Sequence, residues 1–429
     1  MKMCSRKCIW ENMEILFLSI LITQYMGALG SFEQVIPATL ASLVYIIYRI
    51  LFFFYSIYGV YYVLIRKQRG RIKKPFFIYI CFFMYLIFAG LICANDYNMF
   101  GHEITRLLGT AAIAMYIGYK FSLKRIILIA GCAQSIIVGM IWYLYLFYPS
   151  IVTYSDAFFG KNLIGLYTTK NTCAYELAFG VIIALVWVLF YTEGIKKISG
   201  MILAVVQLPL IVTCHAVGAL VCVIFALIIS LLYTLKKRKM GLGTLFISVT
   251  AVFWIVVYVI LPLLGGILSY FGKSITLTGR TTIWRGILQY ISKNNWLLGT
   301  GYGTFWNNDN NISMLWSIYS SLGLQQFATG AHNLVLEILL QTGVIGVILF
   351  MMLAFFSLNE IKIEKNDGKE FLLTTVLFYT IRSLVERTFS SMSYDLLFFL
   401  IMIVYSIWHN KNYSFREKEL ERKGKNCKN

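Results

Sequence analysis

Long apolar segments, repeated along nearly the whole chain, constrain the fold more than any other feature of this sequence. A helix needs about 20 mostly apolar residues to cross the hydrocarbon core of a bilayer. One connection is long, 263–333, and every other one reads as a short turn or a basic patch. The sequence therefore predicts an all-α polytopic membrane protein with about 12 transmembrane helices and one large extracytoplasmic loop. The expected spans lie near 13–31, 39–65, 75–94, 103–119, 126–148, 172–192, 199–214, 216–235, 242–262, 333–357, 370–390 and 393–409.

The distribution of charge predicts the orientation of these spans. The chain is 59% hydrophobic and 13% charged, which excludes an ordinary soluble protein. The net charge of +19 does not indicate a nucleic-acid-binding protein, because Lys and Arg gather in short patches between apolar segments. With the N-terminus inside, most of these patches fall on the cytoplasmic side. Both termini are then expected in the cytoplasm, and 263–333 is expected outside.

Four parts follow from this layout. They are the first nine spans (1–262), the extracytoplasmic loop with an amphipathic helix (263–333), the last three spans (334–409) and a basic cytoplasmic tail (410–429). The nine cysteines stand singly, so neither a disulfide framework nor a zinc site is indicated. The first apolar segment lacks a small-residue cleavage site and is expected to be a retained span.

Some cations do not follow the orientation rule or lie within apolar segments, where charge is costly and tends to be functional. Most would lie near the outer face and favour an anionic ligand there. The alternative is that they snorkel or pair with Glu103, Glu176 or Glu386. These cations are Arg49, Arg106, Lys161, Lys170, Lys273, Arg280, Arg285, Lys293, Arg382 and Arg387.

The long loop contains a predicted amphipathic helix that starts near Arg280 and runs to about Ser292, with Thr278 or Thr281 as its cap. A helix N-terminus beside a guanidinium suits a phosphate. Arg285 lies about 140° further round such a helix and need not face the same ligand. An ordinary interfacial helix is the alternative. The predicted apolar stripe consists of Ile283, Ile287 and Ile291.

Two further groups stand at predicted helix ends. A neutral imidazole at His332, beside Asn333, could take a proton from a hydroxyl, although a capping or snorkelling role is the alternative. Lys170, followed by Asn171, places a cation at a helix start. The glycine-rich segment 299–303 has no strand before it, so a tight turn is favoured over a dinucleotide site.

Near the end of the eleventh span, Arg382 and Glu386 are four residues apart. They could pair with each other or face a polar cavity.

These pieces, in this order, resemble the O-antigen ligase/polymerase family of bacterial envelope glycosyltransferases, over roughly residues 160–390. The resemblance rests on Lys170-Asn171, Thr278-Gly279-Arg280 with Trp284, the segment 298–303, and Ala331-His332-Asn333 followed by Glu337 and Gly343. It implies a metal-independent, inverting glycosyltransferase of the all-helical (GT-C-like) membrane type in the bacterial cytoplasmic membrane, with no cofactor. The donor would be an undecaprenyl-pyrophosphate-linked oligosaccharide.

The resemblance further implies that Arg280 binds the donor pyrophosphate and that His332 is the general base for the acceptor hydroxyl. From charge and placement, we add Arg285, Lys170, Asn171, Asn333, Arg382 and Glu386 as substrate-binding residues. One departure concerns the turn 213–219, where family members often carry an Arg. This chain has no Arg there, and His215 or Arg106 is a candidate substitute.

The predicted function is therefore repeat-unit polymerisation on the outer face of the membrane. Two alternatives are ligase-type transfer to another acceptor and transport of a lipid-linked oligosaccharide. A transporter usually shows internal repeats and interrupted spans near the midplane. The expected partners are the lipid-linked donor, the bilayer, a flippase and a chain-length regulator, with no nucleic acid.

Overall fold

The computed structural model describes residues 2–65, 74–156, 160–190, 194–235, 241–260, 263, 279–324, 330–360 and 369–408. A helix lies at every position where the sequence predicts a span. The protein is therefore an all-α membrane protein, as predicted, apart from one short hairpin. The helices at these positions are α1 (Lys2–Tyr25), α2 (Ala38–Ile65), α3 (Lys74–Cys93), α4 (Tyr97–Lys120), α5 (Leu123–Phe147), α7 (Lys170–Phe190), α8 (Gly194–Thr213), α9 (Val217–Leu235), α10 (Leu242–Ile255) extended by the π-helical η2 (Val256–Ile260), α15 (Leu334–Asn359), α16 (Lys369–Ser383) and α17 (Tyr394–Trp408).

Within the described residues, six helices are long and apolar enough to cross a membrane: α2, α3, α5, α7, α10 with η2, and α15. Four shorter apolar helices lie within α8, α9, α16 and α17. The count of twelve crossing helices stays a prediction, as does the side of the membrane on which each connection lies. The predicted tail, 410–429, lies outside the described residues.

Two of the predicted spans end earlier than expected. The span at 13–31 ends with α1 at Tyr25, because Gly27 adopts a left-handed conformation (φ 73°) that turns the chain into the short helix η1 (Ser31–Gln34). The span at 370–390 ends with α16 at Ser383. The charged residues that follow turn toward ion-pair partners in other segments.

The connection between α5 and α7 also differs from the predicted short turn. It contains the single-turn helix α6 (Pro149–Val152) and two antiparallel strands, β1 (Thr153–Asp156) and β2 (Gly160–Leu163). Their register pairs Thr153 with Leu163 and Asp156 with Gly160. Strands of four residues are too short to reveal a period of two in the sequence.

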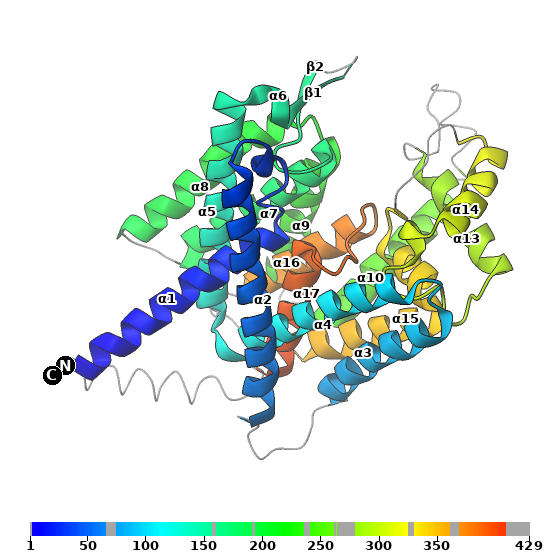
Figure 1. The fold of residues 1–429 in the computed structure, drawn as a ribbon, viewed down its shortest axis with the longest axis horizontal. Coiled ribbons are helices and arrows are strands. Elements are labelled where there is room, and N and C mark those ends of the chain that lie inside the picture. Colours follow the sequence, from blue (N-terminus) through cyan, green and yellow to red (C-terminus); the bar gives the residue numbers. More distant parts are fainter. Residues whose placement is uncertain are drawn as a thin grey trace.

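The core is centred on α17, whose side chains are buried on nearly all sides. This helix packs against α4, α15 and α16, and Figure 1 shows it near the middle of the helices. An all-round apolar helix is the pattern expected of a buried central element. Because α16 and α17 are joined by 384–393, this short segment is held beside the core.

The long loop forms a small apolar cluster of its own. The predicted amphipathic helix is confirmed as α13 (Arg280–Lys293), and its isoleucine stripe is buried. The predicted threonine cap is wrong: Gly279 is the N-cap, with φ 86° and no side-chain cap bond, and Thr278 lies outside the described residues. The short helix η3 (Phe305–Asn307) and the helix α14 (Asp309–Ser321) were not predicted. Both join the cluster, which rests on Leu336 and Leu340 of α15.

A break in α15 receives the glycine-rich turn. Gly343 has non-helical angles (φ 67°, ψ −174°), so carbonyl groups of the preceding turn lose their helical partners. The amides of Thr300 and Gly301 donate to the carbonyls of Leu340 and Gln341 at 3.2 and 3.0 Å. Unpaired backbone groups inside a membrane protein are costly, and these bonds satisfy them. The structure thus confirms the tight turn and shows what it contacts.

Replacing Gly343 with alanine is expected to lower the thermal stability of the detergent-solubilised protein. The left-handed backbone alone costs roughly 1–3 kcal/mol for a residue with a Cβ atom. The added Cβ would also lie 2.1 Å from the carbonyl oxygen of Leu297. Gly139→Ala is the matched control, because no atom lies within 4 Å of the Cβ position on that helix. Equal melting temperatures for the two variants would contradict the prediction.

Candidate active site

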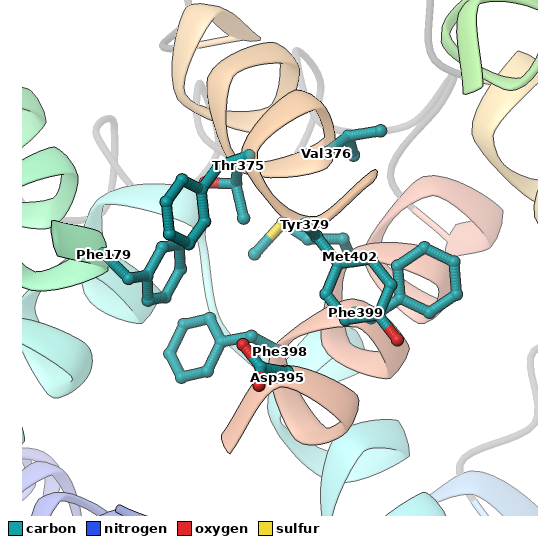
Figure 2. A pocket seen from close by; sticks show the side chains of 9 residues that line it. Phe179, Thr375, Val376, Tyr379, Asp395, Phe398, Phe399 and Met402 are labelled. Atoms are coloured by element: carbon teal, nitrogen blue, oxygen red, sulfur yellow. The ribbon is translucent and has the colours of Figure 1, made fainter. Parts of the chain in front are cut away.

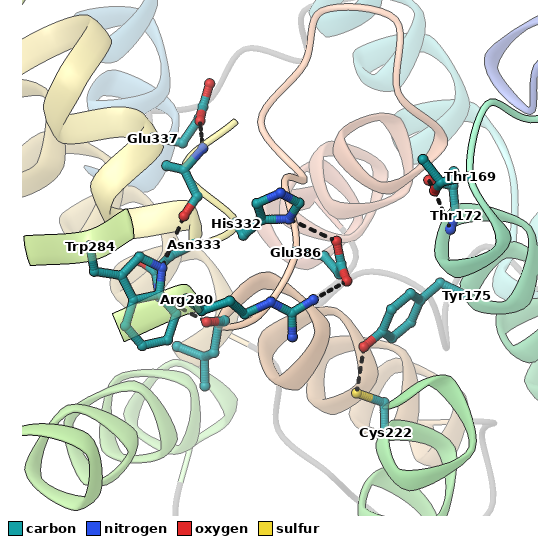
Figure 3. A network of polar contacts seen from close by, with 12 residues as sticks. Thr169, Thr172, Tyr175, Cys222, Arg280, Trp284, His332, Asn333, Glu337 and Glu386 are labelled. Atoms are coloured by element: carbon teal, nitrogen blue, oxygen red, sulfur yellow. Dashed lines mark hydrogen bonds and ion pairs between the residues drawn. The ribbon is translucent and has the colours of Figure 1, made fainter. Parts of the chain in front are cut away.

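A single carboxylate, that of Glu386, joins Arg280 and His332, the two residues for which the family resemblance implies the main chemical roles. Nη2 of Arg280, at the first position of α13, donates to Oε1 of Glu386 at 2.5 Å. Nδ1 of His332, just before α15, lies 3.2 Å from Oε2 of the same carboxylate. Figure 3 shows the guanidinium and the imidazole approaching Glu386 from different segments. Arg280 and His332 are therefore brought together, although they are far apart in the sequence.

The contacts of Glu386 orient the imidazole of His332. Burial by itself raises the pKa of Glu386. The hydrogen bond with His332 and the charges of Arg280, His332 and Arg382 outweigh that effect and hold the pKa below its ordinary value. An ionised carboxylate can only accept hydrogen bonds, so Nδ1 of His332 carries the hydrogen. In the neutral imidazole with this orientation, Nε2 carries the lone pair that a general base needs.

Hydrogen bonds hold the residue just before His332, Ala331, in place. Nε1 of Trp284 donates to the carbonyl of Ala331 at 2.9 Å, and the amide of Ala331 donates to Glu337 at 3.0 Å. The fully buried Glu337 carboxylate also accepts hydrogen bonds from Trp306 and Gln341. His332 itself has φ 47°, a left-handed value that is uncommon for residues other than glycine. Its neighbours therefore fix a conformation that the residue alone disfavours.

Asn333 positions the backbone at this point. Its Oδ1 accepts from the amides of Val335 and Leu336 at 3.0 and 3.2 Å and so caps α15. Its Nδ2 donates to the carbonyl of Leu384 at 2.9 Å, in the segment that carries Glu386. Because its side chain is fully buried, we propose a positioning role for Asn333 in place of the predicted substrate contact.

Asn333→Ala is expected to destabilise the protein by roughly 1–2 kcal/mol, the usual cost of losing a helix cap. It should also lower activity, because the link to the Glu386 segment is lost. Asn308→Ala is the control: Asn308 caps α14 through the amide of Asn311 in the same way. Comparison of melting temperature and transfer rate separates the two effects. Equal activity losses in both variants would sink the positioning role.

Arg382 does not pair with Glu386, so the predicted pairing at four-residue spacing is wrong. It is 3% exposed and contacts Glu176 at 3.0 Å and Asp395 at 2.7 Å, which lie on α7 and α17. The helix α16 ends at Ser383 and the chain then turns, so the side chain of Glu386 contacts Arg280 of α13 instead. Arg382 therefore joins α16 to α7 and α17. A direct substrate contact for it stays a prediction, and the burial favours an anchoring role.

Asp395 borders a small internal cavity between α7, α16 and α17 (Figure 2). The cavity holds about 10 Å³, room for about one water molecule. It is too small for a sugar, so it is not the substrate site.

Comparison with known proteins identifies the relatives of this chain. Residues 105–351 match the family model described as O-antigen ligase, which is more than half of the sequence. The chain belongs to the O-antigen ligase family. It is also 27% identical over 280 residues to the exopolysaccharide production protein ExoQ of Rhizobium meliloti (strain 1021). That alignment covers 60% of this chain and 60% of the relative.

The family match includes Arg280 and His332 but ends before α16. Glu386 and Arg382, which the sequence analysis added from charge and placement, therefore lie outside the matched residues. The family and the apolar helices together indicate a multi-pass membrane protein.

The turn where family resemblance led us to expect an Arg carries His215, which has φ 49°. Its Nδ1 lies 3.1 Å from Oδ1 of the buried Asn162 in β2. Nζ of Lys170 lies 3.5 Å from the same oxygen, and α7 begins at Lys170 as predicted. Asn171 follows in the first turn of α7 and is half-buried. A substrate contact for Lys170, Asn171 or His215 stays a prediction.

Arg285 lies apart from the Glu386 contacts. It is exposed on α13, close enough to Tyr258 of η2 for its charge to act on that phenol. Among the described residues, the contacts of Arg280 and His332 do not include it. Its predicted role in substrate binding remains a separate proposal.

Three of the unusual cations pair with the glutamates that the sequence offered as partners. The pairs are Arg106 with Glu103, Arg382 with Glu176 and Arg280 with Glu386. Pairing does not exclude function, because two of these cations are partly exposed.

Two groups near the site were not assigned to it from the sequence. Arg387 contacts Glu337 at 3.3 Å, and Tyr175 lies under the guanidinium of Arg382 at 5.1 Å. The sequence singled out Arg387 only as one of the unusual cations, without a role of its own.

Proposed function

We propose that this protein polymerises oligosaccharide repeat units on the extracytoplasmic face of the bacterial cytoplasmic membrane. It would transfer the growing glycan from an undecaprenyl-pyrophosphate donor to a sugar hydroxyl of the next lipid-linked unit. The observation that supports this proposal best is the convergence of Arg280 and His332 on Glu386. The guanidinium of Arg280 suits the binding of a pyrophosphate, and the imidazole of His332 suits the acceptance of a hydroxyl proton. A glycosyl transfer needs both.

The proposed reaction is a single displacement at the anomeric carbon of the donor. The acceptor oxygen attacks the anomeric carbon of the donor while its proton passes to Nε2 of His332. A new carbon–oxygen bond forms, and the bond from the anomeric carbon to the phosphate oxygen breaks. The electron pair leaves with the lipid pyrophosphate, and His332 later releases its proton to water. Attack from the face opposite the leaving group makes the transfer inverting.

Arg280 would stabilise the charge that develops on the departing pyrophosphate. Its guanidinium stands at the N-terminus of α13, where free backbone amides also favour an anion. A fixed cation directed at developing charge is a strong catalytic contribution. We propose that arginine supplies this charge and that no metal is needed. A flippase would deliver the donor to this face, and both termini would lie in the cytoplasm.

Ligase-type transfer to a different acceptor is the second candidate function, because the matching family model is described as O-antigen ligase. The same residues would serve, and only the acceptor would differ. The name of the Rhizobium relative, an exopolysaccharide production protein, favours polymer formation. Transport of a lipid-linked oligosaccharide is the third candidate.

The test is a reconstituted assay. Purified protein in liposomes is given a lipid-pyrophosphate-linked repeat unit with EDTA present, and the products are separated by gel. A ladder of glycan lengths that survives chelation is expected. A single transfer only when a different acceptor is added would favour the ligase. Passage of the donor across the bilayer without any transfer would favour transport and overturn the proposal.

A further inference from the structure

Glu386 has two partners that the proposed reaction needs for different purposes. Oε1 accepts from Arg280 at 2.5 Å, and Oε2 lies 3.2 Å from Nδ1 of His332. The shorter contact belongs to the arginine. The side chain of Glu386 is 13% exposed, whereas those of Arg280 and His332 are 21% and 33% exposed. Both partners can therefore be reached from solvent more easily than the carboxylate that holds them.

We propose that Glu386 is a positioning residue that couples donor binding to the orientation of His332. The inference rests on the proposed function. In the structure, Glu386 shares its charge between Arg280 and His332. A bound pyrophosphate competes with Glu386 for Arg280. The carboxylate, having lost the arginine, then forms a stronger hydrogen bond with Nδ1 of His332. The base is thus aligned only after the donor has bound.

The competition follows from charge. A pyrophosphate carries more negative charge than one carboxylate, and a guanidinium binds phosphate oxygens with several parallel donors. Arg280 is the first residue of α13, so the anion that the helix N-terminus attracts would meet its side chain first. The arginine can then leave Oε1 without losing an ionic partner.

The other groups whose charges act on Glu386 are poor replacements for Arg280. Arg382 is a second cation whose charge acts on Glu386, and it is already held by Glu176 and Asp395. Tyr175 on α7, Cys222 on α9 and Asp395 on α17 also interact with Glu386, and none of these three is a cation. A buried carboxylate needs a partner, so the bond to His332 shortens.

The first measurement uses the unmodified protein. The protein is labelled with ¹⁵N-histidine and titrated with a short-chain polyprenyl pyrophosphate in detergent, without an acceptor. A His332→Asn variant identifies the His332 signal among the four histidines. The proton on Nδ1 is expected to move downfield as its bond to Glu386 shortens. No movement at saturating polyprenyl pyrophosphate would overturn the coupling.

The second measurement compares Glu386→Gln with Glu103→Gln. Both changes remove one negative charge from a partly buried carboxylate that pairs with an arginine. Because Glu386 competes for Arg280, Glu386→Gln should bind polyprenyl pyrophosphate more tightly, by roughly tenfold, the effect of about one net charge-assisted hydrogen bond. Its transfer rate should nevertheless fall by roughly 100-fold or more, as expected when a base loses the carboxylate that orients it. Glu103→Gln should change neither the affinity for polyprenyl pyrophosphate nor the transfer rate.

The opposite changes in affinity and rate distinguish coupling from a structural role. A residue that merely supports the fold would weaken both when it is replaced. Unchanged or weaker binding by a folded Glu386→Gln variant would overturn the inference while leaving the proposed function intact. If the unmodified protein bound no polyprenyl pyrophosphate and formed no ladder, the proposed function itself would fail.

Discussion

Replacing His332 with alanine should lower the rate of glycan transfer by roughly two to four orders of magnitude, the usual contribution of a positioned general base. Nδ1 of His332 faces Glu386, so Nε2 is the atom that can take the acceptor proton. Donor binding should change much less, because Arg280 stays in place. The measurement is the initial rate of ladder formation in liposomes, together with the affinity for polyprenyl pyrophosphate.

Two controls separate chemistry from folding. The left-handed backbone at His332 is tolerated by asparagine better than by most residues. His332→Asn should therefore remain folded and still lose activity. His102→Ala removes a second histidine that also lies beside a glutamate, Glu103, at 3.5 Å, and is exposed on α4. If His102→Ala lost as much activity as His332→Ala, the assignment of the base would be wrong.

The second large effect is expected for Arg280. Its replacement by alanine should lower the transfer rate by roughly 100- to 1,000-fold. This is the usual effect of removing one hydrogen-bond donor that stabilises negative charge in a transition state. Affinity for polyprenyl pyrophosphate should fall as well, because the guanidinium contacts the ground-state donor and the leaving group. The same liposome assay and binding titration report both quantities.

The comparison with Lys293→Ala tests whether general charge explains the effect. Lys293 is exposed in the last turn of the same helix, so its loss changes the net charge equally. Wild-type rates are expected for that variant. Arg280→Lys should recover part of the activity, since it restores the charge but not the planar pair of donors. Equal losses for Lys293→Ala and Arg280→Ala would rule out a specific site.

The sequence alone predicted the features that depend on local pattern. Each membrane helix is a run of apolar residues, and such a run forms a helix wherever it lies in the chain. The same holds for α13, whose isoleucines recur at a helical spacing and are buried as expected. Arg280 and His332 were predicted to share one site, and the structure places them on one carboxylate.

Some local features were missed because their patterns are weak. The helix α14 begins with Asp309, Asn310 and Asn311 and is partly polar, so it did not resemble a span or a regular amphipathic stripe. The strands β1 and β2 are shorter than a recognisable alternation. The cap of α13 was assigned to threonine because that residue type is common there. A glycine in the left-handed region occupies the position instead.

The partners of the charged side chains were decided only by the tertiary structure. From spacing alone, Glu386 and Arg382 could pair or face a polar cavity, but that inference assumed that the helix continued to residue 390. The helix ends at Ser383, and the charges separate: Arg382 turns to α7 and α17, while Glu386 turns to α13 and His332. Apolar periodicity is a local property that the sequence carries by itself. A pairing between distant charges depends on where each helix ends and which segments then meet.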